Sequence, residues 1–420
     1  MYEVSWRHSN AATVDRAVDA ATTAFSTWRH SSLTKRTQVL FAFRELVQVN
    51  KEKIAALITA EHGKVLSDAA GEVTRGLEVV EFACGIPLAI ACGNTVIVKP
   101  SEKDPSATMF MAQLWKEAGL PDGVFNVVHG DKEVVEALLT HPGIKSISFV
   151  GSTPIARYVY ETGTKAGKRV QALGGAKNHM VVLPDADLEL AADAAINAGF
   201  GSAGERCMAI SAIVAVEPIA SALVARIKSR MANLKIGDGT QGADMGPLVT
   251  EVHRDKVASY IKAGADAGAT IGVDGRALEV SGDGFWLGPT LFDNVTPDMS
   301  IYKEEIFGPV LSVIRVHTFD EALALVNSHQ YGNGTAIFTN DGGAARRFQN
   351  EVEVGMVGIN VPIPVPMAYY SFGGWKNSLF GDSHAHGTEG VHFFTRGKVV
   401  TSRWLDPSHG GINLGFPQND

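Results

Sequence analysis

The chain has few cysteines for its length. Cys84, Cys92 and Cys207 are the only three in 420 residues. They are too few for a disulfide framework, and such low cysteine usage suits a reducing compartment. A surplus of basic residues is also missing, because 45 Asp and Glu outnumber 37 Lys and Arg and give a net charge of −8. We therefore expect neither nucleic acid nor an anionic membrane surface as a partner, since both require basic residues to neutralise phosphates.

Long apolar runs are absent as well. No stretch approaches the length of a membrane span, and the first residues lack the basic-then-apolar pattern of a secretion signal. We expect a cytoplasmic protein that does not cross a membrane. What is present is an ordinary globular mixture, 45% apolar and 20% charged, with 44 glycines that predict many tight turns. At 420 residues the chain is too long for one core and predicts two or three domains.

The hydrophobic pattern predicts an α/β fold. Residues 11–86 carry apolar residues at helical spacing, and one of the expected helices, Leu66–Phe82, contains Arg75. From residue 88 short β-branched runs alternate with helical runs, which is typical of a doubly wound parallel sheet, and a second α/β region follows. Strands are expected at 95–98, 124–128, 146–150, 180–183, 309–316, 335–339 and 355–360.

Cys207 is the cysteine with the most distinctive surroundings. Its segment, Gly201-Ser-Ala-Gly-Glu-Arg-Cys-Met-Ala209, places small residues before the thiol, so an approachable loop or helix end is expected. Arg206 is adjacent and would help to hold a thiolate. The alternative is a small buried hydrophobic residue, the usual fate of a free cysteine, and the spacing alone leaves both interpretations open. Cys84 and Cys92 each lie beside apolar residues and are expected to be structural.

Three other segments are candidates for ligand binding. Lys99-Pro-Ser-Glu102 follows a strand, and the carboxyl ends of parallel strands are where α/β sheets bind ligands. Phe149-Val-Gly-Ser152 joins a strand to a helix, whose N-terminus favours a pyrophosphate. Glu304–Pro309 places two acids and an aromatic ring before a strand. Each is also compatible with an ordinary loop or turn. The histidines have no metal-ligand spacing, so no metal site is expected.

Six motifs in register across residues 11–404 resemble the aldehyde dehydrogenase superfamily. They are Lys99-Pro-Ser-Glu102, Phe149-Val-Gly-Ser152, Leu173-Gly-Gly175, Glu205-Arg-Cys207, Glu305-Ile-Phe-Gly-Pro309 and Ser371-Phe-Gly-Gly374. Within that superfamily, segments 175–179, 206–209 and 360–366 are similar to the CoA-acylating methylmalonate-semialdehyde dehydrogenase branch.

The resemblance implies an activity and a set of residue roles. It implies oxidation of a short carboxylated aldehyde, methylmalonate or malonate semialdehyde, by NAD, with coenzyme A as co-substrate. Cys207 matches the nucleophile, which forms a thioester after hydride transfer. Arg75 and Arg206 match the pair that binds the substrate carboxylate, a task suited to the guanidinium group. The cofactor positions are matched by Lys99, Glu102, Lys103, Gly151, Ser152, Gly174, Glu305 and Phe307.

The resemblance also implies an organisation and a cofactor preference. We expect a helical region with a dinucleotide-binding domain at 1–178, a catalytic domain at 179–380, and a C-terminal arm at 381–420 that contributes to a homo-oligomer, a dimer or tetramer. NAD is expected rather than NADP, because Glu102 would repel a 2′-phosphate.

The general base of the hydrolytic relatives is not present in this sequence. Those relatives carry Glu-Leu-Gly-Gly, where the Glu activates water against the thioester. Here the segment is Ala172-Leu-Gly-Gly175, and alanine cannot take a proton. Coenzyme A, a soluble thiol that ionises unaided, can replace water, which favours an acyl-CoA product.

A segment of several tens of residues is expected to be missing near residue 87. In the family it holds the first strand of the nucleotide-binding sheet and a Pro-Phe-Asn-Phe-Pro motif whose Asn donates to the oxyanion. Here Gly85-Ile-Pro87 continues directly into Leu88. We expect a gap in the sheet beside Thr95–Val98. Two alternatives therefore stay open: a non-acylating aldehyde dehydrogenase, and a catalytically impaired remnant that binds a dinucleotide.

Overall fold

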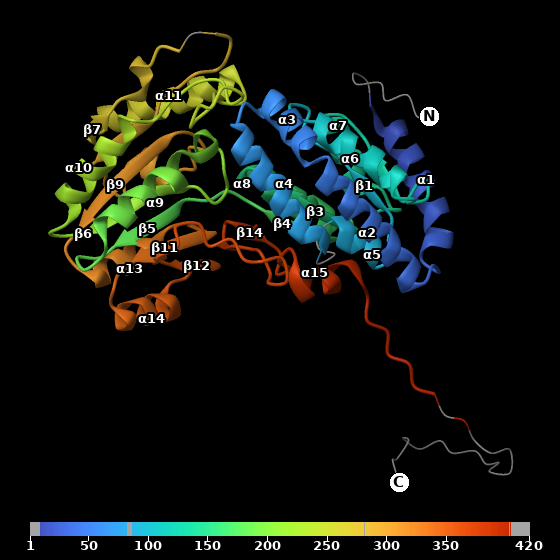
Figure 1. The fold of residues 1–420 in the computed structure, drawn as a ribbon. Helices are drawn as coiled ribbons and strands as arrows, with labels where there is room; N and C mark the ends of the chain where they lie inside the picture. The colour runs from blue at the N-terminus through green and yellow to red at the C-terminus, as the bar shows by residue number, and fades with distance from the viewer. Residues whose placement is uncertain (1–8, 82–85, 281, 403, 405–420) are drawn as a thin grey trace.

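The computed structural model describes residues 9–81, 86–280, 282–402 and 404, and it shows two α/β bodies side by side (Figure 1). The helices are α1 (Ala11–Trp28), α2 (Leu33–Val49), α3 (Lys51–His62), α4 (Leu66–Glu81), α5 (Ile86–Ala91), α6 (Ser106–Glu117), α7 (Lys132–Thr140), α8 (Thr153–Lys165), α9 (Leu188–Phe200), α10 (Ala220–Met231), α11 (Glu251–Asp266), α12 (Ser300–Lys303), α13 (Phe319–Ser328), α14 (Gly342–Glu351) and α15 (Gly387–Phe394), with 3₁₀ turns η1 (Gly201–Gly204) and η2 (Gly275–Ala277). The strands are β1 (Val96–Val98), β2 (Phe125–Val127), β3 (Ser146–Val150), β4 (Arg169–Leu173), β5 (Asn178–Val182), β6 (Ile210–Val216), β7 (Thr270–Val273), β8 (Thr290–Asp293), β9 (Val310–Val316), β10 (Tyr331–Gly332), β11 (Gly334–Phe338), β12 (Met356–Ile359), β13 (Trp375–Lys376) and β14 (Leu379–Phe380).

The larger sheet has seven strands in the order β12-β11-β5-β6-β9-β8-β7. Every neighbouring pair is parallel except β7 and β8. All five residues of β5 and all five of β11 are buried, because helices cover both faces of the sheet (Figure 1). A parallel strand that is buried on both faces reads as a continuous apolar run, and Met180, Val181 and Val182 show that pattern.

The N-terminal body is held together by packing of its helices. The apolar face of α2 is buried at Val39, Leu40, Phe43 and Val47. The ring of Phe43 stacks on Trp115 of α6, so the N-terminal helices and the β1–α6–β2 region share one core. Helix α3 is capped by Gly63, whose φ of 89° lies in the left-handed region. Lys64 and Val65 then connect α3 to α4.

The sheet of the N-terminal body is divided in two. Strand β1 pairs in parallel with β2, and β3 pairs in parallel with β4, which also has β14 antiparallel on its other side. No strand of the described residues joins β1 to β3. Ser148 and Val150 of β3 are exposed, whereas an interior strand of a doubly wound sheet would be buried on both faces. The predicted gap beside Thr95–Val98 is therefore confirmed, and it lies between β1 and β3.

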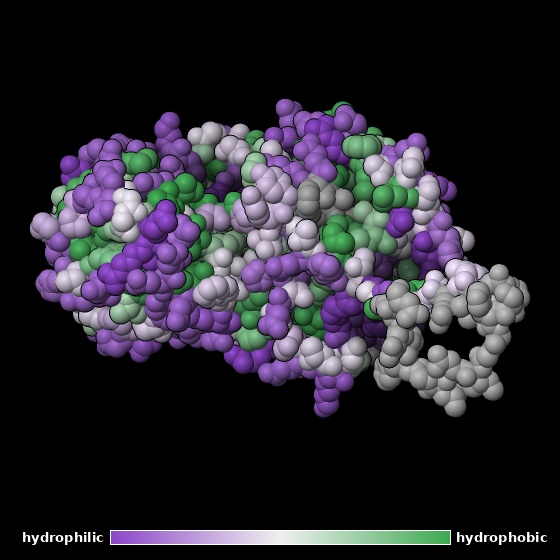
Figure 2. Space-filling model, turned by 90° about the horizontal axis from the view of Figure 1, so that it is seen from below, coloured by the Kyte–Doolittle hydropathy of each residue, from purple (hydrophilic) through white to green (hydrophobic). Residues whose placement is uncertain are grey.

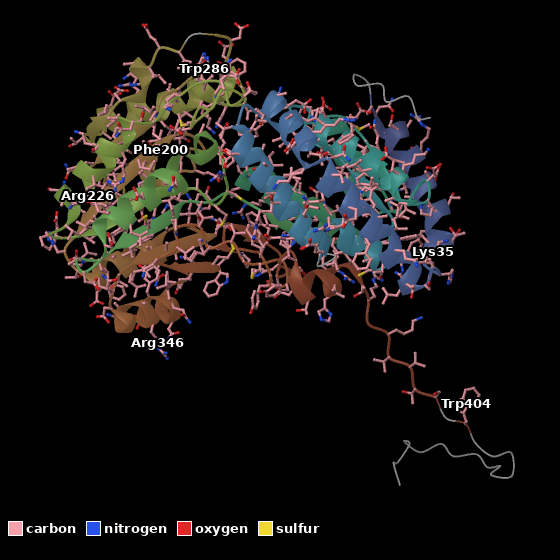
Figure 3. All side chains as sticks on the ribbon, viewed as in Figure 1. Lys35, Phe200, Arg226, Trp286, Arg346 and Trp404 are labelled. Carbon is pink, nitrogen blue, oxygen red and sulfur yellow. The ribbon has the colours of Figure 1, made fainter. Side chains whose placement is uncertain are left out.

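The C-terminal segment returns to the N-terminal body. The guanidinium of Arg169 on β4 donates to the carbonyl oxygens of His392, Phe393 and Thr395 at 2.7, 2.6 and 2.6 Å, which satisfies the end of α15. Beyond α15 the described chain runs away from the body to Trp404, which is 94% exposed (Figures 1 and 3). Hydrophilic and hydrophobic residues are interspersed over the face seen in Figure 2. No described helix is long and apolar enough to cross a membrane.

Candidate functional site

Cys207 follows a tight turn whose shape requires small residues. Turn η1 comes directly after α9, and its Ser202 and Ala203 have φ values of 50° and 52°. Gly204 has φ 72°, and any side chain on it would collide with the carbonyl of Gly308. The small residues before Cys207 therefore allow this turn to pack directly against the segment that contains Glu305 and Phe307.

Two asparagine side chains hold the backbone of Cys207. Asn178 Nδ2, at the start of β5, donates to the Cys207 carbonyl at 2.9 Å, and Asn333 Nδ2 donates to the same oxygen at 3.0 Å. Asn178 also donates to Ala209 at 2.9 Å and accepts from the Gly334 amide at 3.0 Å, so it joins β5, β6 and β11. The sequence assigned neither asparagine a role, although a polar residue at the start of a buried apolar strand is a signal that could have indicated one.

The structure brings four of the predicted site residues to one small cavity. Cys207, Glu305 and Phe307 line it together with Arg206, and its volume of about 20 Å³ is close to that of one water molecule. The remaining lining residues are Ala176, Asn178, Gly199, Gly204, Ala209, Ile210, Ser211, Ile306, Gly308 and Val310.

A larger hollow of about 370 Å³ lies at the other end of the parallel strands, between the segments that follow β5 and β9. The carboxylates that line it already have hydrogen-bond or ion-pair partners within the protein. Asp185 accepts from Thr339 and Asn340, Glu217 pairs with Arg315, and Asp341 accepts from the first amides of α14. None of the site residues predicted from the sequence lines this hollow.

The thiol of Cys207 is not activated by Arg206. Burial raises the pKa of Cys207, and the nearby Glu305 carboxylate raises it further. The Arg206 guanidinium instead pairs with Asp68 of α4, and the hydroxyl of Ser202 donates to the same carboxylate at 2.6 Å. The expectation that Arg206 would hold a thiolate is therefore wrong for this structure, because Asp68 neutralises the guanidinium.

Glu305 is fixed by the glycine turn that follows β4. Its Oε1 accepts from the Ala176 amide at 2.8 Å, and any side chain on Gly175 would collide with its carboxylate. The Gly175 amide donates to Thr153 Oγ1 at 2.8 Å, which connects the turn to the first residue of α8. Burial raises the pKa of Glu305, whereas the bond from Ala176 and the charge of Lys177 lower it.

Six of the eight predicted cofactor residues lie at the carboxyl ends of parallel strands, in two groups, whereas Glu305 and Phe307 lie before β9 at the Cys207 cavity. Lys99, Glu102 and Lys103 follow β1, and Lys99 Nζ lies 3.5 Å from Glu102 and donates to the Gly130 carbonyl at 3.2 Å. The second group belongs to the other sheet. Gly151 and Ser152 follow β3, Gly174 follows β4, and Ser152 is the N-cap of the 13-residue helix α8.

Arg75 lies on α4 and is partly exposed. It donates to Glu78 at 2.6 Å and to the Pro366 carbonyl at 2.6 Å. Asp68, the partner of Arg206, lies seven residues earlier, which places it on the same face of the helix, roughly 10 Å away along the axis. Within the described part of the chain the two guanidinium groups share no common partner, so their joint role in binding a carboxylate stays a prediction.

Glu205, the residue before Arg206, is a buried carboxyl group with few partners. It is 6% exposed, and its Oε2 has no hydrogen-bond partner among the described residues. Its Oε1 is 3.5 Å from the Val249 amide and 3.6 Å from His253 Nε2, which itself donates to the Phe307 carbonyl at 2.6 Å. Burial raises the pKa of Glu205 to about 8.

Glu205→Gln is expected to stabilise the fold at pH 8 by about 1–3 kcal/mol, because the neutral amide removes a buried charge that has few partners. The pKa of Glu205 rises from 4.5 to about 8 on folding. Between those values the folded state keeps a proton that the unfolded state releases, so stability falls as pH rises. Urea unfolding at pH 5 and pH 8 measures the effect, with Glu251→Gln on exposed α11 as control. Equal pH dependence in Glu205→Gln and wild type would contradict the assignment.

The described residues contain no group of three or more His, Cys, Asp or Glu side chains placed to hold a metal ion.

Comparison of the sequence with known families identifies the chain. The sequence model of the aldehyde dehydrogenase family matches residues 3–88 and 83–400. The match is broken at 83–88, where the missing segment is expected. A malonate-semialdehyde dehydrogenase from Pseudomonas aeruginosa is 53% identical, and the alignment covers 96% of this chain and 92% of that protein. It runs over 455 positions, more than the 420 residues of this chain, so the relative contains positions that this chain lacks.

Solved structures agree with the sequence comparison. A methylmalonate-semialdehyde dehydrogenase from Oceanimonas doudoroffii superimposes with a TM-score of 0.94 at 48% identity, covering 95% of this chain and 92% of that one. A Sinorhizobium meliloti 1021 protein of the same name, complexed with NAD, gives a TM-score of 0.93 at 47% identity, covering 95% and 91%. With this fold, this cavity around a cysteine and these matches, the chain belongs to the aldehyde dehydrogenase family.

Proposed function

We propose that the chain oxidises malonate or methylmalonate semialdehyde with NAD and transfers the acyl group from Cys207 to coenzyme A. The observation that carries the proposal is the convergence of Cys207, Glu305 and Phe307 on one cavity. The names of the relatives and the NAD complex of the Sinorhizobium protein support the same substrate class and cofactor.

The described residues fit a dinucleotide. The Ser152 side chain is not used to cap α8, so the amides and hydroxyl at that helix N-terminus are available to a pyrophosphate. A side chain on Gly174 would meet the Asn377 carbonyl at 2.6 Å, so only glycine allows this turn to pack against Asn377. The carboxylate of Glu305, held by the Ala176 amide, would accept a bond from a ribose hydroxyl, and Phe307 lies two residues further along the chain.

The chemistry at Cys207 proceeds in two stages. Cys207 Sγ loses its proton and adds to the aldehyde carbon, which forms a thiohemiacetal. NAD, when bound, accepts the hydride that this carbon then loses, and an acyl thioester remains on Cys207. The sulfur of coenzyme A adds to the thioester carbonyl, the bond to Cys207 breaks, and acyl-CoA leaves while Cys207 regains a proton.

The surroundings of Ala172 favour coenzyme A over water as acceptor. Ala172 is fully buried on β4 and packs in an apolar cluster with Ala156 and Val159 of α8. It does not line the Cys207 cavity, and it carries no carboxylate that could activate water. Hydrolysis of the thioester on Cys207 is therefore expected to be slow, and its transfer to the thiolate of coenzyme A is expected to be faster.

The function is tested by mixing the chain with NAD and malonate semialdehyde, with and without coenzyme A, and following NADH. We expect a burst of about one NADH per site without coenzyme A and continued turnover with it. Steady turnover to the free acid without coenzyme A would indicate a non-acylating enzyme. A folded chain that gives no burst would indicate the dinucleotide-binding remnant.

Arg75→Ala is expected to lower kcat/KM for malonate semialdehyde by about 10- to 100-fold while propanal is affected within threefold or so, because only the first substrate carries a carboxylate for the guanidinium to bind. Kinetics on the two aldehydes measure the difference. Arg44→Ala is the control, since Arg44 also pairs with carboxylates in the helical region. Equal losses on both aldehydes in Arg75→Ala would refute the role.

We also propose the organisation and assembly that the resemblance implies. The boundaries are 1–178, 179–380 and 381–420, and the assembly is a homo-oligomer, a dimer or tetramer. The exposed C-terminal segment with Val399 at 95% and Trp404 at 94% exposure supports an arm that packs against a second copy.

A further inference from the structure

Lys177 is a buried lysine without a role in the chemistry above. It is 2% exposed, and its Nζ donates to the carbonyl oxygens of Ile301 at 2.6 Å and Glu304 at 3.0 Å. A lysine is almost never buried to this degree unless its ammonium group is bound, so these two carbonyls are the reason that it is tolerated.

The residues on either side of Lys177 in sequence contact Glu305 and Cys207. The amide of Ala176 donates to Glu305, and the side chain of Asn178 donates to the Cys207 carbonyl. Lys177 lies between them. Its bond to the Glu304 carbonyl acts on the peptide unit that leads into Glu305, so it fixes the direction in which the Glu305 side chain leaves the backbone.

We propose that Lys177 is a positioning residue whose ammonium group holds the turn from Ile301 to Glu304 and thereby keeps Glu305 on Ala176 and beside Cys207. The proposal deepens the proposed function, because the role of Glu305 in cofactor binding belongs to that function. The hydrogen bonds that carry it exist without cofactor.

The strength of this arrangement depends on the charge of Lys177. Bonds from an ammonium to a carbonyl are roughly twice as strong as those from a neutral amine. Burial lowers the pKa of Lys177 to about 7, and the charges of Glu305 and Glu304 raise it. The turn should therefore loosen as pH rises through about 7. The other titratable groups near Lys177 are His179, His329, Tyr302 and Lys376.

The two histidines and Tyr302 do not titrate in the same range. Burial lowers the pKa of His179 well below 6.5 and that of His329 to about 4, so both are neutral above pH 6. Burial raises the pKa of Tyr302, which stays protonated. A change in the turn between pH 6 and pH 8 therefore comes from Lys177, from Glu305 or from Glu205, whose pKa is raised to about 8 and whose Oε1 lies 3.6 Å from the His253 ring that donates to Phe307. Substitution of Lys177 separates its contribution from the other two.

Amide hydrogen exchange over residues 300–308 of the cofactor-free chain tests the proposal, with rates corrected for the intrinsic pH dependence. We expect Lys177→Met to lower protection there by at least about tenfold and to remove its fall between pH 6 and pH 8. Lys168→Met is the matched control, since Lys168 is also buried and donates to two carbonyls, of His141 and Ile144, at 2.5 and 2.9 Å. This control should leave residues 300–308 unchanged.

Lys177→Arg and NAD binding complete the test. Arginine stays charged at every accessible pH, so Lys177→Arg should keep protection that no longer depends on pH, even if Lys177→Met does not fold. NAD titrations followed by tryptophan fluorescence should give a higher Kd for Lys177→Met than for wild type. If wild type fails to bind NAD while exchange changes as expected, the proposed function fails and the role of Lys177 stands. If wild type binds NAD and protection over 300–308 is unchanged in Lys177→Met, the role of Lys177 is refuted.

Discussion

Cys207→Ser is expected to abolish NADH formation, lowering the rate by roughly four orders of magnitude or more. A serine hydroxyl ionises far less readily than a thiol, so it is a much weaker nucleophile at neutral pH. The resting thiol is itself held neutral by burial and by Glu305, so catalysis depends on the intrinsic nucleophilicity of sulfur. Single-turnover NADH fluorescence with malonate semialdehyde measures the loss.

Cys92→Ser is the matched control for this experiment. Cys92 is also a free, partly buried cysteine whose pKa is raised by burial, but it follows α5 and does not line the cavity. Its variant should form NADH at close to the wild-type rate. Cys84 lies outside the described residues, and Cys84→Ser is expected to behave in the same way. NADH formation by Cys207→Ser at the rate of either control would show that the nucleophile is a different residue.

Inserting the missing segment of the Pseudomonas relative between Pro87 and Leu88 is expected to raise NAD affinity, turnover and stability together. The segment would supply a strand between β1 and β3 and the asparagine that the resemblance assigns to the oxyanion. One oxyanion donor contributes about 10²–10³ in kcat, or about 2.7–4 kcal/mol. Pairing two open strand edges also satisfies backbone groups that are otherwise left to solvent. NAD titration, steady-state kinetics and urea unfolding measure the three quantities.

An insertion of the same length made of Gly and Ser separates the strand from the effect of chain length. It should recover none of the three quantities, because it has neither strand propensity nor the asparagine. A sheet that is already stable without the missing strand would give a different result. If the present chain protects Val96–Val98 from hydrogen exchange as deeply as β5 and β6, and binds NAD at micromolar concentration, the sheet needs no further strand and the prediction is wrong.

The strands that the sequence predicted well are those with a clear period or clear boundaries. Ser146–Val150 is found with the expected ends, and the strand expected at 309–316 is found at Val310–Val316. Strand β6 (Ile210–Val216) was not expected, because a continuous buried apolar run has no period that separates a strand from a helix. Strand β4 was not expected either, since its Arg169 and Gln171 have no strand preference and its pairing with β3 determines its conformation.

Some residues of the candidate site could be predicted from the sequence, and others could not. Cys207, Glu305 and Phe307 could be proposed from local motifs, because the turns that hold them are built from neighbouring residues. The partner of Arg206 could not, since Asp68 lies 138 residues earlier on α4. Asn333 reaches Cys207 across 126 residues for the same reason. Contacts of that length depend on how helices and sheets pack, and no pattern within a short segment encodes them.

The gap between β1 and β3 has a consequence for the chain at high concentration. An unpaired strand edge is a template for pairing with another molecule, and soluble proteins usually shield such edges with charge, proline or a covering element. Strand β3 presents Ser148 and Val150 instead, and Val150 is 64% exposed. Refolding from denaturant should therefore compete with intermolecular strand pairing, and the yield of native protein should fall as the protein concentration during refolding increases.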